Sequence, residues 1–167
     1  LRSVGVQGDS RSYRPVLALE RHPLSGPNLH DEATQLINRR SDVNRVVARV
    51  AGAAPLEGMR VFRSLLSASR LARLRRADAI VRRFTHESGF DRQVWQFPVV
   101  LIPAGTPGRP DSVVLRPVHS VDGMTAQSVL MERSLLDPLA EELVAVDGVC
   151  AVFYDLTHKP PATIEWE

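Results

Sequence analysis

Cysteine, lysine and aromatic residues are scarce in this sequence of 167 residues. Cys150 is the only cysteine, so no internal disulfide can form and no cysteine-based zinc site is indicated. It stands in the apolar run Val-Cys-Ala-Val-Phe at 149–153, which predicts a buried core residue rather than an exposed nucleophilic thiol. The lack of a disulfide framework fits a reducing compartment, and we therefore expect a cytoplasmic protein.

Long apolar runs and known enzyme motifs are missing as well. No stretch approaches the roughly 20 apolar residues that cross a bilayer, so we expect no membrane partner. The sequence has no G-x-S-x-G nucleophile elbow, no P-loop and no dinucleotide-binding fingerprint. Its five histidines are scattered without H-x-x-x-H spacing, and no metal site is predicted. With 44% hydrophobic residues, the chain nevertheless has the apolar content of an ordinary globular domain.

Basic residues are almost all arginine, since Lys159 is the only lysine. They concentrate between residues 57 and 88, where apolar residues also recur at helical spacing. Nucleic-acid binding would require stacking aromatics or a known RNA-binding motif, but aromatics make up only 5% of the chain. We therefore predict that this arginine-rich face is solvated or forms ion pairs between subunits. The apolar stripe comprises Leu71, Leu74, Ala77, Val81 and Phe84, and the arginines are Arg63, Arg70, Arg73, Arg75, Arg76, Arg82 and Arg83.

The two halves of the sequence share one order of predicted elements, which is strand, strand, helix, strand. In the first half these are strands at 3–8 and 14–20, a helix at 29–39 and a strand at 43–50. In the second half they are strands at 97–102 and 112–119, a helix at 133–145 and a strand at 149–156. We predict an α+β fold of two repeated ββαβ units that form α/β sandwiches and are joined by a basic helical segment. The predicted boundaries are 1–56, 57–95 for the helical connector, and 96–167.

Proline marks several interruptions in this pattern. The run 103–110 contains three prolines and two glycines, and is predicted to be a loop. Pro15 and Pro117 fall inside predicted strands. Because proline has no N–H to donate to a ladder, we expect these two positions at an edge or at a strand end.

The N-terminal turn Val6-Gln7-Gly8-Asp9-Ser10-Arg11 combines residue types that suit ligand binding. A carboxylate at Asp9 and a guanidinium at Arg11 can present a hydroxyl acceptor and an anion clamp to the same ligand. The same residues also suit a simple hairpin turn with a local ion pair. Residue types alone leave both interpretations open.

The C-terminal segment, residues 154–167, carries the only lysine followed by two prolines, and ends in Ile-Glu-Trp-Glu. Disordered ends are usually poor in bulky apolar residues, so this segment is predicted to dock on the domain. The Pro-Pro pair is stiff and restricts the direction in which Lys159 leaves the chain. Such a segment suits a ligand-binding tail with a cation and carboxylates, and it equally suits an ordinary final edge strand.

Four stretches of the sequence closely resemble the C-terminal domain of glutamine-hydrolysing GMP synthetases. They are Val4-Gly5-Val6-Gln7-Gly8-Asp9, Ser120-Val121-Asp122-Gly123-Met124-Thr125-Ala126, Tyr154-Asp155-Leu156-Thr157 and Lys159-Pro160-Pro161-Ala162-Thr163-Ile164-Glu165-Trp166-Glu167. Their order matches that of the family. Residues 21–112 resemble the insertion of the long form of this domain, so the resemblance covers nearly the whole chain and is weakest at 51–95. Since Leu1 leads directly into a strand-like pattern, we expect a fragment of a longer polypeptide.

The resemblance implies a reaction to which this chain contributes only a part. Members of the family make GMP from XMP, ATP and glutamine, using a glutaminase domain and an ATP pyrophosphatase domain that adenylates XMP. The loop that binds pyrophosphate, typically Ser-Gly-Gly-Val-Asp-Ser, is absent here, as is a glutaminase triad. We therefore expect a fragment that is inert alone, with no catalytic residue, no metal and no cofactor of its own. ATP and Mg are expected for the full enzyme.

The same resemblance implies that the chain supplies homodimerisation and part of the XMP pocket. Asp9, Gln96, Lys159 and Glu165 match positions that contact XMP, and Arg11 is expected near the XMP phosphate. Lys159 can neutralise a phosphate, Gln96 can donate or accept, and the carboxylates can accept from ribose hydroxyls. The sequence departs from the family at His158, where many members have a small residue.

Two other functions remain open at this point. The chain can be a free-standing dimerisation or regulatory module that binds a purine nucleotide without catalysis. It can also be a basic adaptor for nucleic acid, which would bind oligonucleotides with a steep dependence on salt.

Overall fold

We describe the protein from a computed structural model that defines residues 1–7, 10–20, 29–40, 42–52 and 54–166. The helices are α1 (Leu29–Arg39), α2 (Ala68–Ser88) and α3 (Arg133–Val144), with short 3-10 turns η1 (Leu56–Gly58) and η2 (Phe90–Arg92). The strands are β1 (Arg2–Gln7), β2 (Ser10–Leu19), β3 (Arg45–Gly52), β4 (Arg60–Val61), β5 (Val99–Ile102), β6 (Ala104–Gly105), β7 (Asp111–Leu115), β8 (Val118–His119), β9 (Gln127–Ser128) and β10 (Val149–Asp155). Helices and strands alternate irregularly along the chain, and the predicted α+β class is confirmed.

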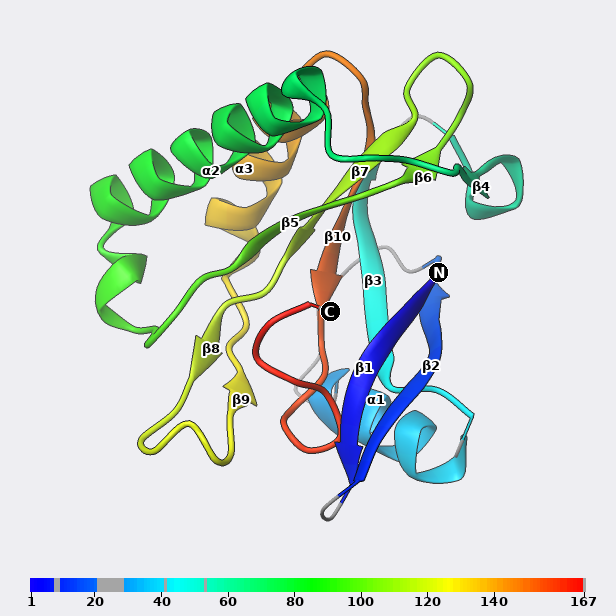
Figure 1. Cartoon of the computed structure of the whole chain (residues 1–167). Helices are drawn as coiled ribbons and strands as arrows, with labels where there is room; N and C mark the ends of the chain where they lie inside the picture. The colour runs from blue at the N-terminus through cyan, green and yellow to red at the C-terminus, as the bar shows by residue number, and fades with distance from the viewer. Residues whose placement is uncertain (8–9, 21–28, 41, 53, 167) are drawn as a thin grey trace.

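One mixed sheet of six strands forms the centre of the molecule, in the order β1-β2-β3-β10-β7-β5 (Figure 1). The outer pairs β1–β2 and β5–β7 are antiparallel, while β2–β3 and β7–β10 are parallel. At the middle, β3 and β10 pair antiparallel and join strands from both halves of the chain. The halves thus share a single sheet, and the domain boundaries drawn from the sequence stay a prediction.

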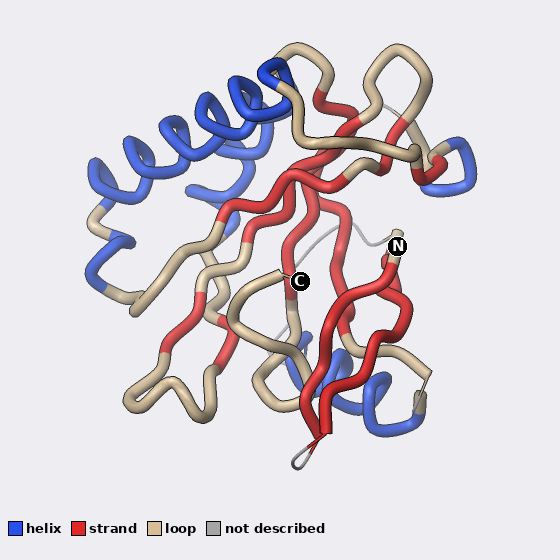
Figure 2. Tube along the Cα trace, viewed as in Figure 1, coloured by secondary structure: helices blue, strands red, loops and turns tan. Residues whose placement is uncertain are grey.

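The three helices pack against one face of this sheet (Figure 2). Alternation along β10 places Val152 and Tyr154 toward the helices, and Ala151 and Phe153 toward the opposite face. Because both faces are covered, every residue of β10 is buried, and its sequence is a continuous apolar run rather than an alternating one. Cys150 belongs to this run and is buried, as predicted.

Helix α2 begins and ends where its sequence provides caps. The Ser67 hydroxyl accepts a hydrogen bond from the Arg70 N–H, and Gly89 adopts the left-handed conformation with φ 73° that closes the helix. Its buried face includes Ala77 and Val81, two members of the predicted stripe. No helix among the described residues is both long and apolar enough to cross a bilayer.

Four arginines of α2, namely Arg70, Arg73, Arg82 and Arg83, form ion pairs within the chain. Arg70 and Arg73 both pair with Asp111 on β7, which is almost completely buried. Arg83 pairs with Glu142 on α3. The pairs with Asp111 and Glu142 attach α2 to the sheet and to α3, which the sequence did not indicate. Arg75, Arg76, Arg82 and Arg83 are exposed, in accord with the predicted solvated face.

The connector predicted at 57–95 is helical only in part. Residues 60–61 form the short strand β4, which pairs with β6 at residues 104–105. β6 lies within the run predicted as a loop. Helix α2 starts only at Ala68, because Ser67 takes an extended conformation and caps it. Helical periodicity does not show where the helix starts, which depends on this cap and on the β4–β6 pairing.

Pro15 lies inside a long strand, and its surroundings explain how that is tolerated. β2 pairs with β1 through residues 10–15 and with β3 through residues 16–19. Pro15 stands where the strand changes partner, so its missing N–H interrupts neither ladder. The Pro15 carbonyl accepts from the Asn44 N–H. Pro117 separates β7 from β8 and so lies between two strands, in accord with the prediction.

Candidate functional site

The C-terminal tail, defined here as residues 156–166, folds back over the sheet after β10 and lies between β1 and the β8–β9 hairpin (Figure 1). On one side Ala162 forms a bridge with Gly5 of β1, and the Val6 N–H donates to the Pro161 carbonyl at 2.7 Å. On the other side Lys159 bridges Ala126 through hydrogen bonds of 2.8 and 3.1 Å. The tail is therefore docked, as predicted, but through isolated bridges rather than as a final edge strand.

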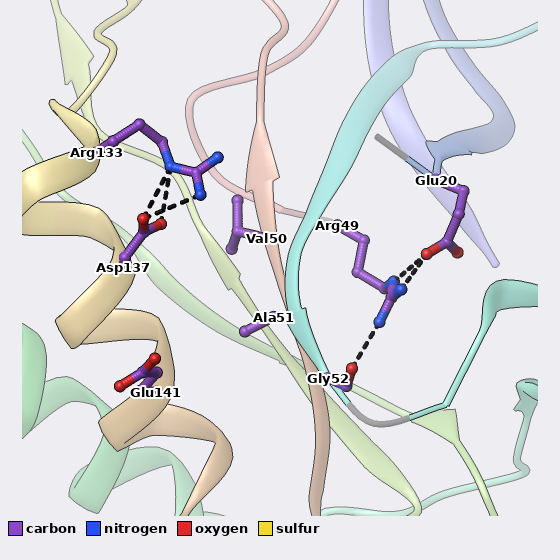
Figure 3. A pocket seen from close by; sticks show the side chains of 8 residues that line it. All are labelled: Glu20, Arg49, Val50, Ala51, Gly52, Arg133, Asp137 and Glu141. Carbon is purple, nitrogen blue, oxygen red and sulfur yellow. Dashed lines mark hydrogen bonds and ion pairs between the residues drawn. The ribbon is translucent and has the colours of Figure 1, made fainter. Parts of the chain in front are cut away.

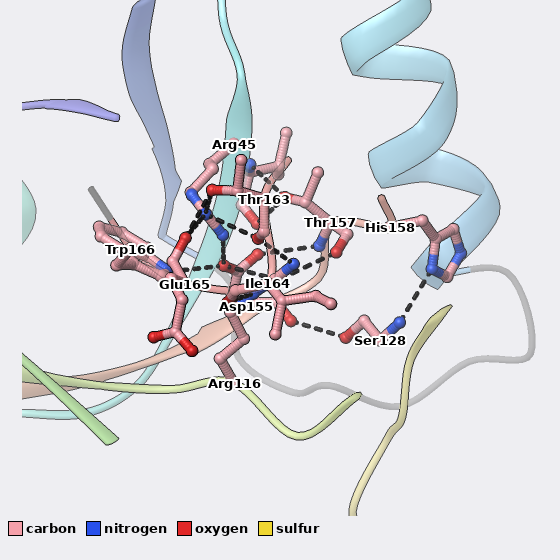
Figure 4. Close-up of polar contacts among 11 residues, drawn as sticks. Arg45, Arg116, Ser128, Asp155, Thr157, His158, Thr163, Ile164, Glu165 and Trp166 are labelled. Atoms are coloured by element: carbon pink, nitrogen blue, oxygen red, sulfur yellow. Dashed lines mark hydrogen bonds and ion pairs between the residues drawn. The ribbon is translucent and has the colours of Figure 1, made fainter. Parts of the chain in front are cut away.

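Three charged side chains that are fully buried lie beneath the tail, and we call them the Arg–Asp–Arg cluster: Arg45, Asp155 and Arg116 (Figure 4). Arg45 starts β3, Asp155 ends β10, and Arg116 follows β7. Because β3 runs antiparallel to β10 and β7 runs parallel to it, these positions meet at the same end of three adjacent strands. Oδ2 of Asp155 lies 2.8 Å from Arg45 Nη1 and 2.9 Å from Arg116 Nη1.

The two guanidinium groups hold the backbone of the tail. Arg116 donates to the carbonyls of Ile164, Thr157 and Thr163 over distances of 2.9, 3.0 and 2.8 Å. Arg45 Nη2 donates to the carbonyls of Thr163 and Glu165 at 2.9 and 2.7 Å. A planar guanidinium offers five N–H donors in a fixed geometry, so each arginine can satisfy a carboxylate and several carbonyls at once.

The surroundings of Asp155 favour the ionised form of its carboxyl group. Complete burial raises the pKa of its carboxyl group, but the positive charges of Arg116 and Arg45 outweigh that effect and hold the pKa below its ordinary value. Hydrogen bonds from the Thr157 N–H and from the indole N–H of Trp166, both 2.9 Å long, act in the same direction. The carboxylate of Asp155 thus has cationic partners at the ends of two strands and hydrogen-bond donors at both ends of the tail.

Trp166 closes the cluster from the outside. Its ring centroid lies 4.8 Å from the guanidinium carbon of Arg45, which is within the range of a cation–π contact. The ring also packs beside the apolar residues on the sheet face that the helices leave open. The predicted docking of the Ile-Glu-Trp-Glu end thus has a specific structural basis, which the structure defines up to Trp166.

Lys159 is the predicted site residue whose surroundings are defined most fully. Its ammonium group donates a 2.6 Å hydrogen bond to the Gly123 carbonyl in the turn between β8 and β9. An ammonium carries three donors, so this bond leaves two of them for another acceptor. The neighbouring His158 accepts from the Ser128 N–H through Nδ1 at 3.0 Å, which fixes the tail further against β9.

Glu165 and Gln96 lie on different parts of the same surface. The Glu165 carbonyl is held by Arg45, while its exposed side chain points away from the cluster (Figure 4). Gln96 is half-buried and exchanges backbone hydrogen bonds with Val118 of β8. Because β8 pairs with β9, and Ala126 just before β9 bridges Lys159, one path of backbone contacts links Gln96 to the tail.

The N-terminal turn extends this path on the far side of the tail. Arg11 is exposed on β2 opposite Val6, the residue whose N–H donates to the tail. Asp9 lies outside the described residues. The structure therefore connects Arg11 on β2, Lys159 in the tail and Gln96 beside β8 through one layer in the order β2, β1, tail, β9, β8, although these residues are far apart in the sequence.

Sequence reasoning missed the Arg–Asp–Arg cluster. In the sequence Asp155 belongs to a family motif and Arg45 to a predicted strand, and neither pattern indicates that the two meet. The available signal was a charged residue placed directly at the end of an apolar run, as in Arg45-Val-Val, Val-Val-Leu-Arg116 and Val-Phe-Tyr-Asp155. A charged residue at the end of an apolar run usually marks only the end of a strand. It forms a buried ion pair only where strand pairing places an opposite charge beside it.

A hollow of about 450 Å³ lies between β3 and α3, away from the tail (Figure 3). Its arginines are already paired within its wall, Arg49 with Glu20 and Arg133 with Asp137. None of the predicted site residues that the structure describes is among its lining residues. The tail region is therefore the stronger candidate for the functional site.

Both a family profile and individual relatives match this chain over the region that contains the tail, Arg116 and Asp155. A family profile described as the GMP synthase C terminal domain matches residues 83–166. A probable glutamine-hydrolysing GMP synthase of Leptospira interrogans is 38% identical over the whole chain, which covers 28% of that protein. GMP synthases of Nocardia farcinica and Mycobacterium tuberculosis are 40% identical over 73% of the chain, which covers 25% of each of them.

The chain thus spans about a quarter of the length of these relatives. Its long middle section is shared with the Leptospira protein, because that alignment covers the chain from end to end. The profile match covers half of the chain and includes Arg116, Asp155 and the tail. Together with the family motifs in the tail, this match shows that the chain belongs to the GMP synthase C-terminal domain family.

Proposed function

We propose that this chain completes the XMP pocket of a GMP synthase and that the tail makes the contact. The observation that carries the proposal is the position of Lys159, a half-buried residue whose ammonium group lies beside the β8–β9 turn and has two donors left after its bond to Gly123. An ammonium on a fixed segment suits the phosphate of a nucleotide. The relatives are named glutamine-hydrolysing GMP synthases, and XMP is the nucleotide that the family resemblance of the sequence implies.

The other predicted contacts fit the same proposal. Arg11 on β2 would supply a second cation for the phosphate, and Gln96 would donate to or accept from the purine base. Glu165 and Asp9 would accept hydrogen bonds from the ribose hydroxyls. Activation of XMP by ATP and Mg, and release of ammonia from glutamine, would take place on other domains of the same enzyme. A cytoplasmic location stays a prediction.

Lys159→Ala in the complete enzyme should raise the KM for XMP on the order of tenfold to a hundredfold, because a charge-assisted hydrogen bond contributes about 1.5–3 kcal/mol. The KM for ATP should stay unchanged, since the ammonium group is assigned only to XMP. Initial rates at varied XMP and ATP measure both constants. Arg75→Ala, which removes an exposed cation from α2, is the matched control and should change neither constant. An unchanged KM for XMP in Lys159→Ala would refute the assignment.

We propose homodimerisation through this domain as the second part of its function. The chain has a mass of 18.5 kDa, and sedimentation equilibrium at tens of micromolar protein should give twice that value. The mass should fall toward that of the monomer on dilution. A monomer at every concentration would contradict the proposal without affecting the assignment of the XMP contacts.

A further inference from the structure

The ion pairs and most printed hydrogen bonds of the Arg–Asp–Arg cluster join its members to one another or to the tail, and none of its side chains is exposed to solvent. It cannot touch a nucleotide directly, because all three side chains are fully buried. A contribution to fold stability would not explain the cluster, because buried ion pairs often stabilise a protein no more than apolar residues of similar volume do. The cluster therefore calls for a role that apolar packing cannot fill.

That role follows from which atoms the arginines contact. Their donors reach the carbonyls of Thr157, Thr163, Ile164 and Glu165, which lie on either side of Lys159 along the tail. Apolar side chains would pack against the tail but would not fix the direction of any carbonyl. Hydrogen bonds from rigid guanidinium groups do fix it, and thereby set the backbone from which Lys159 and Glu165 project.

We propose that Arg45, Asp155 and Arg116 are positioning residues for XMP binding. Asp155 orients the two guanidinium groups, and the guanidinium groups hold the tail so that Lys159 and Glu165 are already in place before XMP arrives. This inference rests on the proposed function of the tail. It assigns affinity for XMP to residues that never contact XMP, because a tail ordered in advance does not have to be ordered on binding.

Arg116→Lys separates the effect of the guanidinium hydrogen bonds to the tail from the effect of the positive charge beside Asp155. Lysine keeps a positive charge beside Asp155, but a single ammonium cannot replace the three donors that Arg116 directs to the carbonyls of Thr157, Thr163 and Ile164. In the complete enzyme we expect the KM for XMP to rise on the order of tenfold, with kcat and the KM for ATP little changed. Amide hydrogen exchange in residues 157–166 should become faster in the absence of XMP and slow again at saturating XMP.

Arg73→Lys is the matched control. Arg73 also pairs with a buried aspartate, Asp111, and donates to a backbone carbonyl, that of Asp147, but it attaches α2 instead of the tail. Its replacement should lower thermal stability without changing the KM for XMP or exchange in the tail. An equal rise of the KM for XMP in both variants would reduce the role of Arg116 to general stability and overturn the proposal.

The double variant Arg116→Lys, Lys159→Ala gives a readout that a structural role would not move. If Arg116 acts through Lys159, Lys159→Ala should raise the KM for XMP much less in the Arg116→Lys background than it does in the wild type. Fully multiplicative effects would count against positioning. A raised KM in Lys159→Ala with an unchanged KM in Arg116→Lys would overturn only the positioning role, whereas no effect in either would overturn the proposed function itself.

Trp166→Phe keeps the test decisive if Arg116→Lys does not fold. It removes the 2.9 Å bond from the indole to Asp155 and leaves both arginines in place at a partly exposed site. We expect faster exchange in the tail and a rise of a few-fold in the KM for XMP. Unchanged exchange together with an unchanged KM would overturn the proposal.

Discussion

Asp155→Asn should lower the free energy of unfolding by about 3–5 kcal/mol at neutral pH, because it leaves two buried guanidinium groups without a counter-charge. Asparagine has nearly the same shape as aspartate, so no cavity contributes to the loss. Its amide nitrogen cannot accept the bonds that Oδ2 now receives from Arg45, Arg116 and Trp166. Urea unfolding of both proteins followed by circular dichroism gives the difference directly.

The difference in the free energy of unfolding between wild type and Asp155→Asn should become smaller as the pH falls. The pKa of Asp155 is held below its ordinary value in the folded state, so the unfolded chain binds the proton more readily. The carboxylate therefore contributes its full stability above the unfolded pKa, about 3.9, and loses it as the pH falls through the folded pKa. Wild type and Asp155→Asn should differ by a constant amount from pH 5 to 7 and converge in acid.

Asp137→Asn is the control for this experiment. It makes the same chemical change in the partly exposed pair with Arg133 on α3, where the aspartate side chain is 45% exposed. Exposed ion pairs between residues one helix turn apart contribute less than about 1 kcal/mol to the free energy of unfolding. The unfolding curve of Asp137→Asn should therefore nearly match that of the wild type. An equally small effect for Asp155→Asn would mean that water reaches the cluster and that the buried arginines do not depend on the carboxylate.

Gly5→Ala should destabilise the domain by about 3 kcal/mol through overpacking against a side chain that cannot move. A methyl group at this position would overlap the Asn44 side chain. Asn44 is fully buried and donates hydrogen bonds of 2.9 Å to the carbonyls of Ser3 and Ser12, so turning it away would break both bonds. Because Gly5 also bridges Ala162, the shift would loosen the tail as well.

A double-mutant cycle with Asn44→Ala distinguishes this explanation from a general effect of glycine in a strand. Removing the Asn44 side chain takes away the overlapping atoms, so Gly5→Ala should cost little in that background. The double variant should then lose hardly more free energy of unfolding than Asn44→Ala alone. Additive losses in chemical denaturation would show that the Asn44 contact is not the reason for glycine at this position.

The sequence alone predicted the features that depend on neighbouring residues. The spacing of apolar residues predicted the helix at 29–39, and the structure has α1 at those residues. The apolar run from Val149 predicted β10 and the burial of Cys150 within it. The bulky apolar end of the chain predicted a docked segment, and family resemblance identified the chain. Each of these conclusions needed only local pattern or matching residues.

Tertiary structure alone decided how the tail is held. Arg45 and Asp155 are 110 residues apart, and neither position requires the other in any local pattern. They meet because β3 lies antiparallel beside β10, and Arg116 joins them because β7 lies parallel on the other side. Strand pairing is a long-range property, set by which apolar faces pack together. A charge at a strand end thus becomes part of a buried cluster only when the sheet is assembled.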